Sequence, residues 1–303
     1  MTPQPLSILI YHRVLARPDP LFPGEVDVRR FARQLHLLRR FYHPLPLPQA
    51  LQRLQDGSLP PRAACITFDD GYADNAQLAL PLLQQHGLHA TFFIASGYLD
   101  GGQMWNDQLI AGVRRASGDM LDLQPLGLGR LPIASVDQRR TAIAHLLGQL
   151  KYLPFAQRQQ LADAITGPIR HTHPAVPPLM LSTAQLRQLQ QAGMGIGAHT
   201  TSHPILATLS DHAAAQEIGQ GRGALEQLLQ APVELFAYPN GKFGSDYGAR
   251  DAALVRALGF KAALATDAGV ARPGDDVYRL PRFTPWRPGA PGFLWQLWQN
   301  RRR

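Results

Sequence analysis

The chain has few of the features that cross-link, anchor or disorder a protein. Its 303 residues include one cysteine, Cys65, so an internal disulfide framework is excluded. No stretch approaches the roughly 18 consecutive apolar residues that a membrane-spanning helix requires. Charged residues make up only 17% of the chain and apolar residues 45%, which excludes a disordered protein and a coiled coil. The composition therefore predicts an ordinary globular protein.

Lysine is scarce, so arginine supplies nearly all of the positive charge. The lysines are Lys151, Lys242 and Lys261, and the formal net charge is +8. A basic surface favours anionic partners such as nucleic acids, acidic glycans and anionic lipid headgroups. No nucleic-acid-binding motif is present, so we expect no specific nucleic-acid partner. Nothing in the sequence indicates the oligomeric state.

The N-terminal segment lacks the marks of an export signal. Residues 1–11 contain no basic leader, and the apolar run at 8–10 is too short for the core of a signal peptide. The sequence therefore predicts a soluble, cytoplasmic protein.

Short apolar runs alternate with helical patterns along most of the chain. We expect strands at residues 7–11, 63–68, 90–95, 194–198, 233–237 and 260–265, with a short last strand at 277–280. Between the strands, apolar residues recur at helical spacing, as in Phe31, Leu35 and Leu38. Ser182 and Ser210 are predicted helix caps, the first in a capping box with Gln185. The alternation predicts an α/β fold with a mostly parallel sheet or barrel.

One stretch, from about residue 101 to 178, shows helical patterns and polar loops but no convincing strand. We interpret it as a helical insertion into a single domain that spans residues 1–303. Near its start, Trp105 could stack on a sugar ring or be buried at the beginning of a helix. His171 and His173 lie between prolines and are expected to be solvated loop residues.

Two adjacent carboxylates, Asp69 and Asp70, follow the predicted strand at 63–68. The active sites of α/β folds lie at the carboxyl ends of strands. Neighbouring residues on an extended segment point in different directions, so one carboxylate could bind a metal while the other faces substrate. The alternative is an ordinary turn, because Asp-Gly is a common turn dipeptide.

Two histidines four residues apart, His199 and His203, follow the predicted strand at 194–198. Both imidazoles can reach one metal ion if they share a helical turn. The alternative is a pair of surface histidines. With one carboxylate of the aspartate pair they would form an Asp-His-His site with open positions for water, which is typical of catalytic metal sites.

A third polar turn, residues 238–241, follows the predicted strand at 233–237. It could aim a backbone N–H at an oxyanion that develops during a reaction. Taken alone, it is as well explained as an ordinary loop.

Together these segments resemble the polysaccharide deacetylases of carbohydrate esterase family 4. The motifs occur in the family's order at residues 67–72 (TFDDGY), 90–94 (ATFFI), 195–200 (GIGAHT) and the turn at Pro239. The resemblance covers about residues 60–100 and 180–265. It implies an α/β fold, a distorted (β/α)7-8 barrel, and metal-dependent removal of acetyl groups from N-acetylated sugars.

The resemblance also implies roles for particular residues. Asp69 matches the family's catalytic base, and Asp70, His199 and His203 match its metal ligands. Asn240 aligns with the residue whose backbone N–H helps to form the oxyanion hole, and Thr200 with a Ser or Thr that supports the site.

The chain departs from the family pattern at two positions. Ala237 replaces an arginine that often orients the base, so either another group holds Asp69 or Asp69 is held less firmly, and Arg279 or Arg282 could replace the missing arginine. The family often has a general-acid histidine near its C-terminus, but no histidine follows His212 in this chain.

We expect His12 to replace that general acid. Residues 10–12 end the first strand with the apolar-x-His pattern of the missing motif. The first and last strands of a closed barrel are neighbours, so a strand can move between the termini without disrupting the site. This arrangement resembles the circularly permuted branch of the family, which includes deacetylases of poly-N-acetylglucosamine. The alternative is a histidine that only forms hydrogen bonds in the barrel mouth.

The sequence therefore predicts a metal-dependent hydrolase that removes N-acetyl groups from amino sugars of a polysaccharide or its precursor, which could be lipid-linked. Its partner would be an N-acetylated glycan. Zinc suits the ligand set, and cobalt or nickel also bind such sites. The alternatives are hydrolysis of another amide on the same barrel and a glycan-binding relative without catalysis.

The C-terminal segment combines aromatic residues with positive charge. Phe293, Trp295 and Trp298 precede three arginines at 301–303. This segment could make peripheral contact with an anionic membrane, or it could be a helix packed on the barrel with a basic end.

Overall fold

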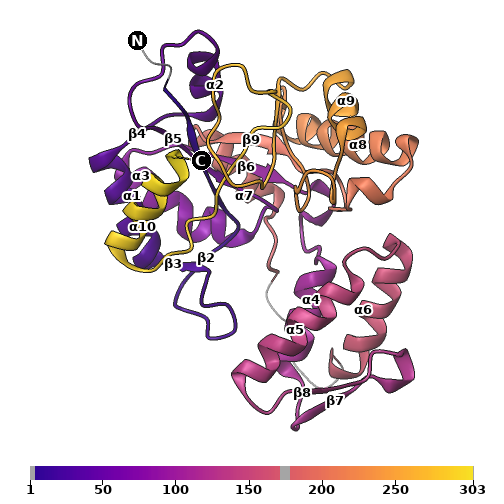
Figure 1. The fold of residues 1–303 in the computed structure, drawn as a ribbon. Coiled ribbons are helices and arrows are strands. Elements are labelled where there is room, and N and C mark those ends of the chain that lie inside the picture. Colours follow the sequence, from indigo (N-terminus) through magenta and orange to yellow (C-terminus); the bar gives the residue numbers. More distant parts are fainter. Residues whose placement is uncertain (1–3, 171–177, 303) are drawn as a thin grey trace. The chain divides into compact units, whose positions relative to one another are not determined.

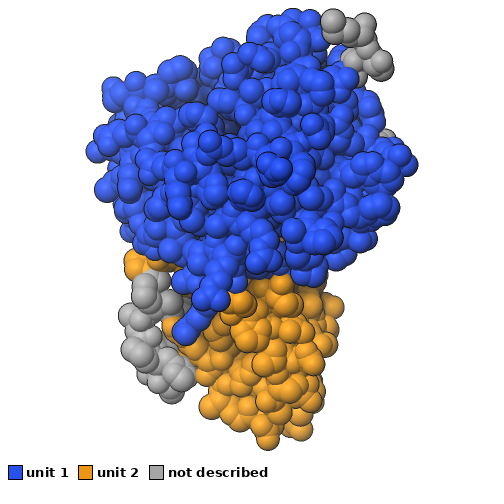
Figure 2. Space-filling model, turned by 90° about the vertical axis from the view of Figure 1, so that its left-hand side faces the viewer, with its two compact units in different colours: residues 1–17, 24–101, 180–303 blue, residues 18–23, 102–179 orange. Residues whose placement is uncertain are grey.

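The computed structural model describes residues 4–170 and 178–302, so His171, His173 and Arg303 lie outside the described residues. The chain divides into two units, shown in different colours in Figure 2. Unit 1 comprises residues 1–17, 24–101 and 180–303, and unit 2 comprises residues 18–23 and 102–179. Within the described ranges, no helix combines the length and the apolar character needed to cross a bilayer.

A seven-stranded parallel sheet forms the centre of unit 1 (Figure 1). Its order is β1 (Ser7–Tyr11), β5 (Ala63–Phe68), β6 (Ala90–Ile94), β9 (Gly195–Ala198), β10 (Leu235–Ala237) and β11 (Ala262–Leu264), and β4 (His43–Pro44) pairs with the start of β5. The strands β1, β5 and β6 are buried along their whole length. Their near-continuous apolar sequences follow from this burial, because both faces of a parallel sheet are covered.

Residues 280–283 connect the two edges of the sheet. Leu280 bridges in parallel to Leu264 of β11, and Phe283 bridges in parallel to Leu9 of β1. The Ile10 N–H donates to the Phe283 carbonyl at 3.0 Å. This segment takes the place of the short last strand expected at 277–280. The result is the predicted α/β architecture, a distorted barrel in which the first strand lies beside the end of the chain's last strand-like segment.

Helices cover the outside of the barrel. They are α1 (Val28–Phe41), α2 (Leu47–Gln55), α3 (Leu80–His86), α7 (Thr183–Gln191), α8 (Asp211–Leu229), α9 (Ala249–Ala257) and α10 (Gly289–Arg301). Short elements complete the unit: β2 (Val14–Leu15), β3 (Val26–Asp27), a π-helical turn η1 (Asn75–Ala79), and the 3-10 turns η2 (Ser96–Tyr98) and η4 (Leu206–Thr208). The Ser182–Gln185 capping box and the Ser210 cap are both present, so these predicted helix starts are confirmed.

Unit 2 has its own apolar core. It contains α4 (Trp105–Arg115), α5 (Val136–Leu150), α6 (Phe155–Arg170), the 3-10 turn η3 (Gln124–Leu126) and the antiparallel strands β7 (Met120–Asp122) and β8 (Arg130–Pro132). Trp105 is buried in this core, with the guanidinium of Arg158 4.9 Å from its ring centroid. The expectation of no strand in this stretch was wrong. The two strands have only three residues each and are mostly exposed, so they lack the buried apolar run that identifies a strand in sequence.

Helix α8 supports the turn that follows β9. At Gly221 the helix comes so close to this turn that a Cβ atom would lie 2.6 Å from the carbonyl carbon of Thr200. One turn earlier, the Glu217 carboxylate accepts hydrogen bonds from the N–H groups of Thr201 and Ser202, at 3.0 and 2.9 Å. The Ser202 hydroxyl donates to the same side chain at 2.6 Å. The position of the turn is therefore set by α8.

A matched pair of glycines on α8 tests this packing. We expect Gly221→Ala to lower the free energy of unfolding by about 1–3 kcal/mol, since its methyl group would overlap the backbone at Thr200. Gly223→Ala adds its methyl group in open space, so it should raise the free energy of unfolding by about 0.5–1 kcal/mol. Chemical denaturation of both variants measures the difference. Equal effects of the two substitutions would contradict the close approach of α8.

Candidate active site

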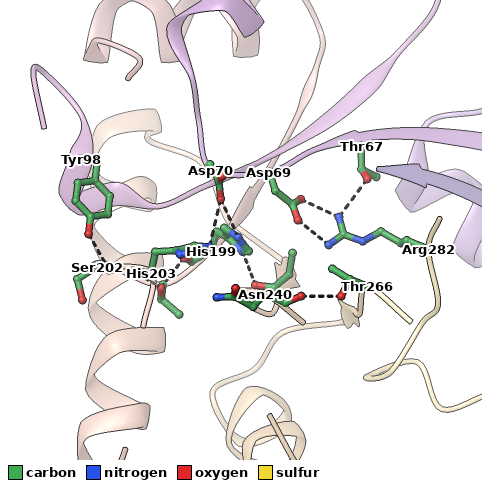
Figure 3. Close-up of polar contacts among 12 residues, drawn as sticks. Thr67, Asp69, Asp70, Tyr98, His199, Ser202, His203, Asn240, Thr266 and Arg282 are labelled. Carbon is green, nitrogen blue, oxygen red and sulfur yellow. Dashed lines mark hydrogen bonds and ion pairs between the residues drawn. The ribbon is translucent and has the colours of Figure 1, made fainter. Parts of the chain in front are cut away.

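The polar residues predicted from sequence gather at one edge of the barrel (Figure 3). Asp69 and Asp70 follow β5, His199 follows β9, and Asn240 follows β10. These strands are parallel, so their carboxyl ends lie at the same edge of the sheet. The α/β topology therefore explains why residues far apart in the sequence meet here.

Asp70, His199 and His203 converge on one point. The Nε2 atoms of His199 and His203 each lie 3.3 Å from Oδ1 of Asp70. One ligand atom from each of the three residues lies within 4.8 Å of the others. Asp70 and His199 are buried, and His203 is partly exposed. The structure thus brings together the three residues that the sequence suggested as a metal site.

Left-handed backbone conformations produce this convergence. Asp70 has a φ of 76° and is followed by Gly71 at 89°, so the two carboxylates diverge because the chain turns and not because it is extended. Thr200 and His203 have φ values of 64° and 53°. The two histidines therefore share an irregular turn, and they converge without the helical turn that the sequence argument gave as a condition. The Thr200 hydroxyl stabilises this turn by accepting from the His203 N–H at 3.0 Å.

The donor set fits a small divalent cation. Oδ1 of Asp70, the atom that faces both imidazoles, is buried and has no hydrogen-bond partner among the residues that the structure describes. Burial alone would raise the pKa of Asp70, but the adjacent imidazoles hold it well below its ordinary value, so the group is a carboxylate. Ligand atoms bound tetrahedrally to zinc would be about 3.3 Å apart, given usual Zn–N lengths. The two Nε2–Oδ1 distances match this spacing.

The orientation of His199 also fits a metal ligand. Its Nδ1 lies 2.7 Å from the carbonyl oxygen of Ala237. A carbonyl can only accept, so Nδ1 carries the proton and Nε2 presents its lone pair towards Asp70. Metal-binding histidines commonly have such a partner on the second ring nitrogen, which fixes the tautomer. The Ala237 carbonyl thus contributes to the site, although its side chain replaces the family's arginine.

Asp69 is held by Arg282 in a buried bidentate ion pair. The two terminal nitrogens of Arg282 donate to Oδ1 and Oδ2 of Asp69 at 2.8 and 2.7 Å. The side chains are 0% and 2% exposed. Arg282 lies in the 280–283 segment that closes the barrel, so the pair connects this segment to the end of β5.

Further contacts fix the Arg282 guanidinium. Its Nε donates to the Ala265 carbonyl at 2.8 Å, and Nη1 also donates to the Thr67 hydroxyl at 3.2 Å. Burial raises the pKa of Asp69, but the charge and hydrogen bonds of Arg282, with the nearby imidazoles, outweigh it and keep this pKa below its ordinary value. Arg279, the other arginine suggested by the sequence, instead stacks on Phe243 at 3.4 Å from the ring centroid.

His12 follows β1 and lies beside the aspartate pair. The adjacent Tyr11 carbonyl accepts from the Asp69 N–H at 2.9 Å. The Asn75 amide donates to the His12 carbonyl at 2.9 Å, so the turn η1 fixes the backbone at this point. His12 is close enough to influence the pKa values of Asp69 and Asp70, both of which it lowers.

Glu25 is an additional acidic residue near His12 that the sequence did not single out. The parallel pairing of Val14 with Val26 brings the segment before β3 alongside the segment before β2. Burial raises the pKa of Glu25, and the nearby His12 and Arg13 oppose this shift. The site therefore contains a half-buried carboxyl group within electrostatic reach of the His12 imidazole.

Asn240 lies in the turn after β10, outside the three-residue cluster. It has a left-handed φ of 59°, which asparagine tolerates better than most residues. Its carbonyl oxygen accepts from the Thr266 hydroxyl at 2.6 Å. Within the described part of the chain its backbone N–H has no acceptor, so this donor is available.

Two positioning residues were not fully predicted from the sequence. Arg282 was one of two candidates, and only the barrel closure distinguishes it from Arg279. Glu217 was missed, although a signal was present: it interrupts the apolar stripe of α8 formed by Ala214, Ile218, Gly221 and Leu225. A carboxylate within such a stripe needs a partner, which here is the turn after β9.

Comparison with known proteins agrees with this geometry. The family model described as polysaccharide deacetylase matches residues 56–118 and 134–263. YxkH of Bacillus subtilis (strain 168), which is described as a polysaccharide deacetylase, is 21% identical over 281 residues. This match covers 92% of the present chain and 71% of YxkH.

Two solved structures have a similar fold. The Streptococcus pyogenes deacetylase PplD, in complex with acetate, matches with a TM-score of 0.65 and 19% identity, over 98% of this chain and 99% of that one. IcaB from Ammonifex degensii matches with a TM-score of 0.62 and 20% identity, over 97% and 96% of the two chains. The matched segments of the family model contain Asp69, Asp70, His199, His203 and Asn240. With the family model matching most of its length, the chain belongs to the polysaccharide deacetylase family.

Proposed function

We propose that this protein is a metal-dependent deacetylase that hydrolyses N-acetyl groups on amino sugars of a polysaccharide or of its lipid-linked precursor. The observation that carries the proposal is the convergence of Asp70, His199 and His203 beside an arginine-held Asp69. A divalent cation bound to the three ligands would polarise the acetyl carbonyl and lower the pKa of a water molecule. Zinc suits this donor set best, and cobalt or nickel are also compatible with it.

Asp69 is the proposed general base. Its depressed pKa keeps it ionised near neutral pH, and a carboxylate is the form that accepts a proton from water. Arg282 engages both carboxylate oxygens and so orients this side chain. Arg282, in the segment that closes the barrel, thereby takes over the orientation of Asp69 that an arginine at position 237 would provide.

His12 and Asn240 are the residues that we propose to act on the leaving amine and on the acetyl oxygen. His12 would donate a proton to the amine as the carbon–nitrogen bond breaks, and Glu25 would orient its ring or stabilise its charged form. The backbone N–H of Asn240 would donate to the negative charge that develops on the acetyl oxygen. Support comes from the electrostatic proximity of His12 to Asp69 and from the available Asn240 donor.

Metal content and acetate release together test this proposal. We expect purified protein to contain a divalent metal and to release acetate from N-acetylglucosamine oligomers. Asp70→Ala should lose both, because the removed oxygen is the atom that faces both imidazoles. His12→Ala should retain metal and lose activity roughly 10²–10⁴-fold, the usual contribution of a general acid.

The outcomes of this experiment separate the alternatives. Metal binding without acetate release would favour hydrolysis of another amide on the same barrel. Failure to bind zinc, cobalt or nickel would contradict the mechanism and favour a glycan-binding role. Full activity of His12→Ala would exclude that residue as the general acid.

The pH dependence of the rate tests the role of Arg282. With Arg282→Gln, Asp69 loses the charge and the hydrogen bonds that oppose the effect of burial most strongly, and only the nearby imidazoles still oppose it, so its pKa should rise. The base would then be protonated at higher pH, and the acid limb of kcat/KM should move upward. Arg282→Lys keeps the charge but loses the bidentate geometry, so its shift should be smaller.

Arg279→Gln is the matched control for this prediction. It removes an arginine three residues before Arg282, but Arg279 stacks on Phe243, and the ion pair with Asp69 is made by Arg282. Its acid limb should coincide with that of the unmodified protein. A shift of similar size in both glutamine variants would point to a general change in charge and contradict the specific role of Arg282.

A further inference from the structure

Arginines gather around a cavity at the junction of α1 and the start of α10. The cavity has a volume of about 240 Å³ and is lined by Arg29, Arg30 and Arg33 of α1, by Arg287, Gly289 and Phe293, and by Asp27, Gln34 and Leu37. Four arginines and one carboxylate thus line this cavity. Within residues 4–170 and 178–302, none of the four arginines forms an ion pair.

The single carboxylate at this cavity is already engaged. Asp27 is the N-cap of α1 and accepts from the Arg30 backbone N–H at 2.7 Å. The Arg30 side chain is anchored by the carbonyl oxygens of Trp286 and Pro285, at 2.6 and 3.4 Å. The Nε atom of Arg30 is buried, and no group in the described ranges forms a hydrogen bond with it. The cavity therefore has a fixed excess of positive charge with no anion from the described chain to balance it.

This arrangement suits a phosphate group. The planar guanidinium presents paired N–H donors that match the oxygens of a phosphate, and several arginines can share one such anion. The cavity is smaller than the usual pocket for a whole drug-sized ligand. It therefore suits a headgroup, with the remainder of the ligand outside.

Exposed tryptophans occur in the part of the chain, residues 286–298, that also contributes Arg287, Gly289 and Phe293 to the cavity. Three of the four tryptophans in the chain are exposed: Trp286 by 58%, Trp295 by 48% and Trp298 by 41%. Trp286 directly precedes the cavity residue Arg287. The Arg287 guanidinium lies 5.5 Å from the centroid of the Trp286 ring. Tryptophan combines a large apolar ring with a polar N–H and is enriched at membrane interfaces.

The outer face of α10 continues this aromatic surface. Trp295 and Trp298 stack with ring centroids 4.7 Å apart, and the Arg302 guanidinium lies 3.7 Å from the Trp298 centroid. The opposite face packs into the barrel through Phe293 and Leu297. The helix is therefore packed on unit 1, as one of the two expectations had it, yet it also presents aromatic rings outward. Figure 1 shows α10 beside α1, which carries three of the arginines.

We propose that this face docks on an anionic membrane, with the phosphate of a phospholipid headgroup in the arginine cavity and the tryptophans in the bilayer interface. The charge argues for this occupant, since the chain carries a net charge of +8 and bilayers rich in acidic phospholipids attract basic surfaces. None of these residues belongs to the candidate active site. The inference therefore goes beyond the proposed deacetylation and stands or falls separately from it.

Vesicle binding by the chain of residues 1–303 tests the proposal. We expect co-sedimentation with vesicles of phosphatidylcholine that contain phosphatidylglycerol, but not with phosphatidylcholine alone, and weaker binding as salt is added. Tryptophan emission should shift to the blue on binding. Replacing both Trp295 and Trp298 by serine should abolish most of this shift and weaken the partitioning.

Charge reversal on α1 identifies the cavity as the site. Arg33→Glu should lower the partition coefficient about 10- to 30-fold, because it replaces an attraction near the anionic surface by a repulsion. Arg40→Glu is the matched control, since Arg40 is exposed on the same helix but does not line the cavity. Its effect should be several-fold smaller. Both variants should release acetate from soluble oligomers as the unmodified protein does.

Three outcomes would overturn the proposal. Equal losses from Arg33→Glu and Arg40→Glu would mean diffuse attraction without a headgroup site. Calorimetric binding of inorganic phosphate that depends on Arg33, with no binding to vesicles, would assign the cavity to a soluble anion. Absence of both would leave the cavity without an anionic ligand.

Discussion

The buried ion pair between Asp69 and Arg282 connects the two parts of the structure on which the site depends. Asp69 directly follows β5, and Arg282 lies 213 positions later in the segment that bridges β11 and β1. Removing one partner of such a pair typically costs about 3–5 kcal/mol, because the other charge stays buried and uncompensated. Barrel closure and the ionisation of the proposed base are therefore coupled through one guanidinium group.

The same closure explains why residues from both ends of the chain can serve one site. Residues 280–283 lie beside β1, so the first strand and the last strand-like segment are neighbours in the barrel. His12 comes from the former and Arg282 from the latter. The chain lacks an arginine at position 237 and a histidine near its C-terminus. It nevertheless keeps a candidate for the general acid, for the base and for each metal ligand.

Much of this arrangement could be predicted from the sequence because it follows from strand ends. Asp70, His199 and His203 each follow a short apolar run, and parallel strands bring such positions to one edge. The details of the turn at 199–203 were not predictable, since they depend on left-handed residues and on Glu217 and Gly221 of a separate helix. The hairpin β7–β8 was also missed, because its strands are short and exposed. The arginine cavity needs residues about 250 positions apart to meet, which only the packing of α10 on α1 provides.

The central claim is that Asp70, His199 and His203 form one metal site. Anomalous diffraction at the zinc edge, from crystals of the full chain grown with zinc, tests it most directly. We predict one strong peak bounded by a carboxylate oxygen of Asp70 and by the Nε2 atoms of both histidines. Zinc bound elsewhere, or bound through Nδ1 of His199 with its bond to the Ala237 carbonyl broken, would contradict the account.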